Sequence, residues 1–187
     1  MTSKIFAKFN RRVLNAALAS TVALAGTGLI STAYAASATS TATSTVIAPI
    51  AIAAPVALSF GRFARGAGGS VTISNSGVRT SSGVVLSSTS SVQTAAKFDV
   101  TGDGNATYGI THSGATVLSD SASTPNTMAL VTTSDLTGGN VTTGNVATGT
   151  LTAGGTQSIF VGGTLTVGAT QVAGTYTGAV TITVEYN

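Results

Sequence analysis

Few side chains in this sequence are of the types that commonly carry catalysis. His112 is the only histidine, and cysteine is absent. A serine nucleophile needs an imidazole base and a third group to orient that base, and no Gly-x-Ser-x-Gly elbow is present. Only five residues are acidic, with no recognisable pair of the kind used in glycoside hydrolysis. We therefore expect no enzymatic activity, and an exposed or edge position for His112 near a strand end.

Oxygen ligands for a cation occur at one place in the sequence. Asp99 and Asp103 are four residues apart, and Asn105 follows two residues later. A hand-type calcium loop requires more acidic residues and a closing glutamate. Asp103-Gly104-Asn105 also has the composition of a turn. We expect no metal site, and a calcium-supported adhesin is the weakest of the functions considered.

A second short segment combines basic residues with glycines. Arg62, Phe63 and Arg65 precede Gly66-Ala67-Gly68-Gly69. A phosphate-binding loop would continue into Lys-Ser/Thr and the start of a helix, and neither follows here. We interpret this segment as a solvated loop, and we expect no cofactor.

The positive charge of the chain is concentrated at its N-terminus. The formal net charge is +3, and four of the eight basic residues lie within the first twelve positions. An apolar run from Val13 to about Ile30 follows, and then Ala33-Tyr34-Ala35 supplies the small residues of a signal-peptidase site. Residues 1–35 are therefore predicted to be a secretory signal peptide, cleaved between Ala35 and Ala36. Arg11-Arg12 fits twin-arginine export only loosely, so general secretion is the favoured route.

Cleavage changes what the charge implies about partners. Four basic and five acidic residues remain after Ala35, which leaves a formal net charge of −1. Neither this charge nor the few scattered aromatic residues suits nucleic-acid binding. Polar residues such as Asn15 and Gly28 also make the apolar run a poor permanent membrane span. We expect an exported protein of the periplasm, cell surface or extracellular space.

The sequence after residue 35 has the composition of an all-β domain. Residues 36–45 form a low-complexity Ser/Thr/Ala leader, and residues 46–187 are predicted to form a single domain. Threonine, valine, serine and glycine dominate there, and apolar residues alternate with period two rather than 3.6. About eight to ten short strands at this spacing predict an immunoglobulin-like antiparallel β-sandwich. The strands are expected at 46–52, 56–60, 71–73, 78–80, 84–86, 96–101, 107–110, 128–132, 158–161 and 179–186, with a hairpin turn at 103–105.

Three segments carry a resemblance to a known family. They are Ala42–Ile50, the Leu58-Ser59-Phe60-Gly61 corner, and Ala173–Gly178 followed by the alternating terminal strand. In their order along the chain and in their residue types they resemble the secreted bacterial family catalogued as domain of unknown function 4402. The same layout is more distantly similar to the pilins of archaic chaperone–usher systems, including the spore-coat-protein-U-like group. Those proteins commonly carry cysteines, which this chain lacks.

The likeness to pilins implies assembly by strand donation. In those proteins the sandwich is incomplete, and the N-terminal segment of one subunit completes the sheet of the next. Here the donor candidates are Val46, Ala48, Ile50 and Ile52, which alternate along one face. The acceptor-edge candidates are Val180, Ile182, Val184 and Tyr186 on the last strand. The donor segment can complete its own sandwich in cis or that of a neighbour in trans, and the sequence leaves both open.

Two functions follow from this interpretation. The first is a non-enzymatic structural protein of a Gram-negative cell surface, a fimbrial or pilin-like subunit that forms homopolymers with a periplasmic chaperone and an usher. The alternative is a self-contained secreted β-sandwich that binds a glycan or another envelope component. Tyr108 and Tyr176 are the candidate contact residues for that alternative.

Overall fold

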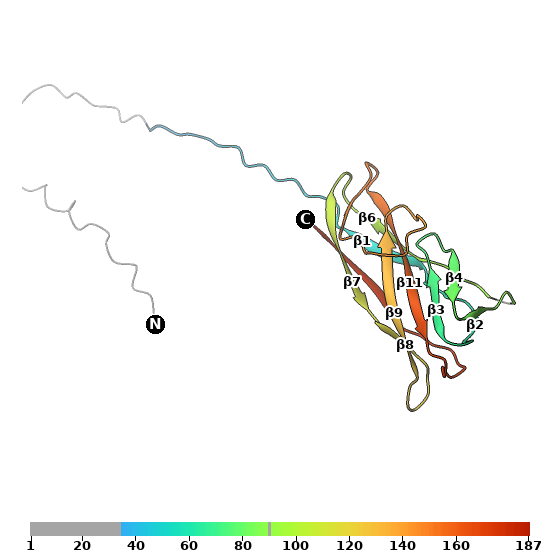
Figure 1. Ribbon diagram of the computed structural model, residues 1–187. Coiled ribbons are helices and arrows are strands. Elements are labelled where there is room, and N and C mark those ends of the chain that lie inside the picture. Colours follow the sequence, from blue (N-terminus) through green and yellow to red (C-terminus); the bar gives the residue numbers. More distant parts are fainter. Residues whose placement is uncertain (1–34, 90) are drawn as a thin grey trace, which may run out of the picture. The chain divides into compact units, whose positions relative to one another are not determined.

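A computed structural model describes residues 35–89 and 91–187 (Figure 1). The predicted signal sequence up to residue 34, with its basic cluster, lies outside the described residues. Ala35 and Ala36, which flank the predicted cleavage site, are exposed and have no regular secondary structure. Residues from Ser44 to Asn187 form one unit with its own core. No described helix has the length and apolar character needed to cross a membrane.

The described residues contain β-strands and no helix, which confirms the prediction of an all-β fold. Threonine and valine favour extended backbone because branching at Cβ restricts χ1. The described residues form twelve strands rather than the ten expected, because the short strands Phe63–Ala64, Val117–Ser119 and Thr148–Thr150 were not predicted and the predicted strand 56–60 does not form. The strands are β1 (Ala51–Val56), β2 (Phe63–Ala64), β3 (Gly69–Ile73), β4 (Arg79–Ser82), β5 (Val85–Leu86), β6 (Ala96–Thr101), β7 (Thr107–Gly114), β8 (Val117–Ser119), β9 (Thr127–Asp135), β10 (Thr148–Thr150), β11 (Thr156–Val167) and β12 (Val180–Tyr186).

The long strand β11 organises the larger sheet. Its first half, Thr156–Val161, pairs with β6, and its second half, Gly163–Val167, pairs with β3 along the same edge. Its other edge pairs with β9. β1 lies beyond β6, β4 beyond β3 and β8 beyond β9, and every pairing is antiparallel. Figure 1 shows β9, β11 and β3 running side by side.

A smaller sheet of three strands has the order β10-β7-β12. Apolar side chains from both sheets meet in one buried cluster, where Phe98, Val100, Ile159 and Val161 of the larger sheet pack with Tyr108, Ile110 and Ile182 of the smaller. A second buried apolar cluster includes Phe60, Val71, Ile73, Leu130 and Leu165. This arrangement is consistent with the predicted β-sandwich.

The turn predicted at Asp103-Gly104-Asn105 does not close a hairpin. Both edges of β6 are occupied, one by β1 and the other by β11. The following strand, β7, therefore cannot pair with β6 and joins the smaller sheet instead. Asn105 adopts a left-handed conformation with φ of 61°, which asparagine tolerates better than most residues. The segment is thus the connection between the two sheets.

The N-terminal strands also differ from the prediction. β1 begins at Ala51 rather than Val46, and it ends at Val56 where a second strand was expected to start. The predicted strand 56–60 makes only an isolated bridge, between Ser59 and Thr94. The pairing of β1 with β6 shifts register between Ala53 and Val56. Pro55 accounts for this register shift, because proline has no N–H for the ladder and is tolerated on an edge strand such as β1.

Candidate functional site

The last strand, β12, presents an unpaired edge. It pairs with β7 on one side only, and none of the described strands pairs with its other side. Two main-chain hydrogen bonds show which residues of this strand bond to β7. They are Ala115 N–H to Ala179 O at 2.7 Å and Asn187 N–H to Thr107 O at 3.3 Å. Because hydrogen-bonded and non-bonded pairs alternate in an antiparallel ladder, the odd-numbered residues of β12 bond to β7. The N–H and C=O groups of Val180, Ile182, Val184 and Tyr186 therefore point to the unpaired edge.

The same four residues turn their side chains toward the core. Ile182 is buried, whereas Val180, Val184 and Tyr186 are only half-buried although they pack against the cluster that joins the sheets. The four predicted acceptor-edge residues thus combine outward main-chain groups with incompletely covered apolar side chains. An additional antiparallel strand could form hydrogen bonds with these main-chain groups and cover these apolar side chains.

The four predicted donor residues do not share one strand. Val46 is 94% exposed, and Ala48 is also exposed. Ile50 and Ile52 are half-buried and pack against the core, and Ile52 pairs within β1 to Val100 of the same chain. The structure therefore places the second half of the donor segment in cis and leaves the first half uncovered.

Tyr186 joins the N-terminal segment to the last strand. Its Oη accepts a hydrogen bond from the main-chain N–H of Asp103 at 2.6 Å. The same hydroxyl donates to the main-chain oxygen of Ala48 at 2.9 Å. Donor and acceptor candidates from opposite ends of the domain are thereby brought together beside the unpaired edge.

His112 lies two residues before the end of β7, but on the central strand of the smaller sheet rather than in the exposed or edge position that was predicted. It is half-buried, and its Nε2 lies 2.7 Å from Oγ of Ser134 on β9, across the two sheets. Burial lowers the pKa of His112 below its ordinary value. Ser134 is only 3% exposed and its Oγ also accepts the N–H of Val146. This Ser–His pair ties the sheets together, and its hydroxyl is shielded from any external substrate.

Among the candidate cation ligands, the Asp99 carboxylate is engaged with other residues. Lys97 lies 2.8 Å from the Asp99 carboxylate, and Ser158 donates to it at 2.7 Å. The hydrogen bond from Lys97, followed by that from Ser158, lowers the pKa of Asp99. Asp103 lies at the sheet-to-sheet connection. Within residues 35–89 and 91–187, no three His, Cys, Asp or Glu side chains form a group suited to a metal ion.

The candidate glycan-binding tyrosines are occupied within the fold. Tyr108 has no exposed surface and donates to Oε1 of Gln157 at 2.8 Å. Tyr176 packs against the second core cluster, and its hydroxyl bonds to Val172 O and to Gln171. The prediction that Tyr108 contacts a ligand is therefore wrong, because its alternating position on β7 points into the core.

Sequence reasoning missed the role of Arg79, which organises the loops around β2 and β5. Its guanidinium donates to Phe60 O, Arg62 O, Ser87 O and Ser91 Oγ at distances from 2.9 to 3.2 Å. The glycine-rich segment after Arg65 is a turn in which Gly68 N–H donates to Arg65 O. The sequence pattern around Arg79 could not predict these contacts, because the partners lie in two loops, one before and one after β4.

A comparison with protein-family models matches residues 50–186 to the family described as Domain of unknown function (DUF4402). The chain belongs to this family. The DUF4402 match begins at Ile50 and so spans every strand from β1 to β12. No curated protein and no solved structure matches the chain.

Proposed function

We propose that this protein is a secreted, non-enzymatic structural subunit of a bacterial cell surface that assembles by β-strand donation. The unpaired edge of β12 carries the proposal, because its outward main-chain groups and half-buried side chains belong to the same four residues. An exposed edge of this kind pairs with other chains unless it is covered. The occupant we propose is the N-terminal segment of a second copy.

The exposed half of the donor segment suits this role. Residues 35–49 are exposed and outside any strand, so they can extend along another subunit with little loss of internal contacts. The hydrogen bond between Ala48 and Tyr186 would be exchanged in the process. Donation that extends to Ile52 would also open the pairs Ala51–Thr101 and Ile52–Val100. Val46 and Ala48 would therefore enter the neighbour first, followed by Ile50 and Ile52.

Export and assembly partners belong to the same proposal. The predicted signal peptide implies passage through the inner membrane to the periplasm or cell surface. A periplasmic chaperone would cover the β12 edge until an usher exchanges it for the next subunit, as the likeness to pilins of Gram-negative bacteria implies. Such protection is needed because an alternating, unpaired edge aggregates readily.

Electron microscopy and size-exclusion chromatography of the exported protein, co-expressed with the chaperone and usher encoded by the same organism, test the proposal. We expect polymers, and Val46→Asp should reduce them strongly because a carboxylate would enter an apolar site on the neighbour. Val131→Asp is the matched control, since Val131 is 65% exposed on β9 and outside both candidate segments. Monomers alone under all conditions, or equal loss in both variants, would contradict strand donation.

A second substitution tests the acceptor edge. Val184→Pro removes an N–H that has no partner on the unpaired side of β12, so the isolated subunit should retain its melting temperature. The same change interrupts the ladder to a donated strand. We expect monomeric, folded protein. Normal polymerisation of folded Val184→Pro would show that β12 is not the acceptor.

A further inference from the structure

The connection between the two sheets has the sequence of a covalent modification site. Asn105-Ala106-Thr107 is an Asn-x-Thr triplet without proline at its centre, which is the acceptor pattern for an N-linked glycan in exported proteins. Asp103 lies two residues before the asparagine. A carboxylate at this position gives a transferase a charged group to bind, and bacterial oligosaccharyltransferases select acceptors by an acidic residue placed there. The chain therefore contains the complete bacterial pattern Asp-x-Asn-x-Thr.

The fold holds the acceptor side chain at the surface. Asn105 is exposed, and its main-chain N–H donates to Thr152 O at 3.1 Å, in the turn between β10 and β11. Ala106 N–H donates to Asp103 O at 3.3 Å and closes a turn around Asn105. Asn105 adopts the left-handed conformation there, with φ of 61°. A glycan is bulky and belongs at the surface of a protein, and an exposed side chain in a turn meets this requirement.

The other positions of the pattern also fit an accessible acceptor. Thr107 is exposed, because alternation along β7 turns the next residue, Tyr108, into the core. Gly104 packs against the main chain of Ala153, where an added Cβ would lie 2.5 Å from the carbonyl oxygen. The buried side of the turn is thus occupied by a residue that the pattern leaves free. The two side chains that define the triplet, those of Asn105 and Thr107, lie outside.

The order of the strands leaves this segment accessible before the domain is complete. β7 pairs with β10 and β12, and both strands follow it in the chain. Thr152 and Tyr186, which bond to the turn, also follow it. Asp103 is half-buried in the finished domain, so a transferase would bind it most readily while the exported chain is still unfolded. General secretion, the favoured export route, delivers the chain in that state.

A second triplet, Asn140-Val141-Thr142, provides an internal comparison. Its asparagine is exposed, like Asn105. Gly138 stands two residues before it, so the acidic residue of the bacterial pattern is missing. An enzyme that needs only Asn-x-Thr would modify both triplets, whereas one that needs the carboxylate would modify Asn105 alone.

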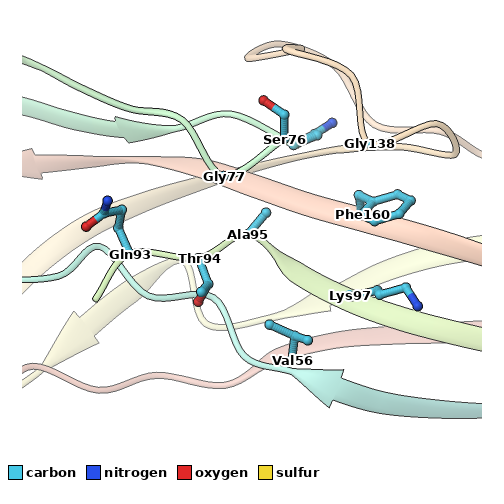
Figure 2. A pocket seen from close by; sticks show the side chains of 10 residues that line it. Val56, Ser76, Gly77, Gln93, Thr94, Ala95, Lys97, Gly138 and Phe160 are labelled. Atoms are coloured by element: carbon cyan, nitrogen blue, oxygen red, sulfur yellow. The ribbon is translucent and has the colours of Figure 1, made fainter. Parts of the chain in front are cut away.

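The loop after β9, which carries the second triplet, borders a cavity of about 370 Å³ (Figure 2). The lining also includes the end of β1, the β3–β4 turn around Asn75, the segment that leads into β6, and β11. Figure 2 shows Ser76 and Gly138 on the same side of the cavity. Asn75 N–H donates to Val141 O at 3.0 Å, and Ser76 Oγ donates to Asn140 Oδ1 at 3.4 Å. The amide of Asn140 is therefore engaged by a neighbouring turn.

We propose that Asn105 accepts an N-linked glycan from a bacterial oligosaccharyltransferase, with an oligosaccharide linked to polyprenyl diphosphate as the donor. Nδ2 of Asn105 attacks C1 of the first sugar, so that a C1–N bond forms while the bond between C1 and the diphosphate oxygen breaks. Polyprenyl diphosphate leaves, and one amide proton passes to a base of the transferase. This inference rests on the proposed export, because donor and transferase act on the outer side of the inner membrane, and it does not require strand donation.

Mass spectrometry of the exported protein tests the proposal. The full chain is co-expressed in a bacterial host with an oligosaccharyltransferase that requires the acidic residue and with the enzymes that make its lipid-linked donor. We expect the mass of one added glycan and a glycopeptide that contains Asn105, with Asn140 unmodified. Exported protein without a glycan, in cells that modify a reference acceptor protein, would overturn the proposal. A glycan at Asn140 instead of Asn105 would overturn it as well.

Failure of export is a separate outcome with its own readout. A chain that stays in the cytoplasm with residues 1–35 uncleaved would contradict the proposed export. The test of Asn105 is then carried out with the signal peptide of a known exported protein in place of residues 1–35, and the same two results decide it.

Three variants assign the modification to its residues. Asn105→Gly removes the acceptor nitrogen, and glycine adopts a φ of 61° without strain, so we expect folded protein without a glycan. Asp103→Asn keeps the triplet and should lower the modified fraction about tenfold, as the loss of one charge-assisted hydrogen bond to the transferase predicts. Asn140→Gln is the matched control and should carry the glycan as the parent chain does. An unchanged glycan in Asp103→Asn, or loss of the glycan in exported Asn140→Gln, would refute the assignment.

Discussion

The hydroxyl of Tyr186, on the last strand, donates a hydrogen bond to the main-chain oxygen of Ala48, ahead of the first strand. Because the same hydroxyl accepts from Asp103 N–H, one atom connects both ends of the domain with the corner between its sheets. The connection lies beside the unpaired edge of β12. Tyr186 therefore links the N-terminal segment to the strand that carries this unpaired edge.

Tyr186→Phe removes both hydrogen bonds and keeps the aromatic packing. We expect a loss of about 1–3 kcal/mol in the free energy of unfolding, the sum for two hydrogen bonds, together with faster hydrogen exchange at the Asp103 amide. Denaturant unfolding and native-state hydrogen exchange measure these effects. Tyr176→Phe is the control, since the Tyr176 hydroxyl bonds only within its own loop, to Val172 and Gln171. Unchanged exchange at Asp103 in Tyr186→Phe would contradict the described link.

Protonation of His112 should weaken the fold. Burial lowers its pKa below the ordinary value of 6.5, so between these two values the unfolded chain binds more protons than the native one. Stability is then fully present above about pH 6.5 and decreases as the pH falls toward the native pKa. Chemical unfolding at about pH 7.5 and about pH 5 measures the decrease.

His112→Gln provides the control for this pH effect, because glutamine can still bond to Ser134 and does not titrate. The variant should show a flat stability over the same interval. The pKa of Asp99 and that of Asp120 lie below 3.8. The stabilisation that these carboxylates provide is therefore lost only below that pH and does not change over the interval in which His112 titrates. A pH dependence that persists in His112→Gln would assign it to another group.

Arg79→Lys should destabilise the loops around β2 and β5. Lysine carries the charge but cannot reach four acceptors at once with a planar fork of donors. We expect a loss of about 1.5–3 kcal/mol, measured by thermal and denaturant unfolding. Arg65→Lys, which affects a single bond from an exposed residue to Gln171 O, should cost far less. Similar losses in both variants would show that the network of Arg79 is not what stabilises these loops.

Gly162→Ala should disrupt the junction between β3 and β11. A Cβ at this position would collide with the main-chain oxygen of Ile73 and would crowd Oδ1 of Asn75 at 2.8 Å. The cost expected for such overpacking is about 1–3 kcal/mol. Gly154→Ala should change stability by less than about 0.5 kcal/mol, because its Cβ would meet only Thr152 Oγ1 at 3.8 Å. Calorimetry on both variants would reveal whether the two glycines differ as stated.

The sequence predicted those strands whose alternation is uninterrupted. Ala96, Phe98 and Val100 are buried on β6, and the alternating residues of β12 occupy the expected positions. β11 was predicted only as residues 158–161, because Gly162-Gly163 looks like a break in a strand. The structure continues it to Val167, since close approach of Ile73 O requires glycine there. A requirement imposed by a neighbouring strand is invisible in a local pattern.

The candidate sites likewise divide into features that a local sequence pattern predicts and features that depend on distant parts of the chain. The strand that contains Val180, Ile182, Val184 and Tyr186 could be predicted, because all four alternate along one segment. The cavity around Asn75 could not, because its lining comes from five separate parts of the chain, and Asn75-Ser76-Gly77 alone reads as an ordinary turn. The His112–Ser134 contact likewise depends on how the two sheets face each other.

The position of β11 determines when the larger sheet can form during synthesis. β1 can pair with β6, β3 with β4, and β8 with β9 as the chain elongates, but only β11 joins these three pieces. Since β11 follows all six of these strands in the chain, the pieces wait with unsatisfied edges until residues 156–167 have been synthesised. Long-range pairing of this kind is slow. The nascent chain is therefore most vulnerable to aggregation just before residue 167 becomes free to fold.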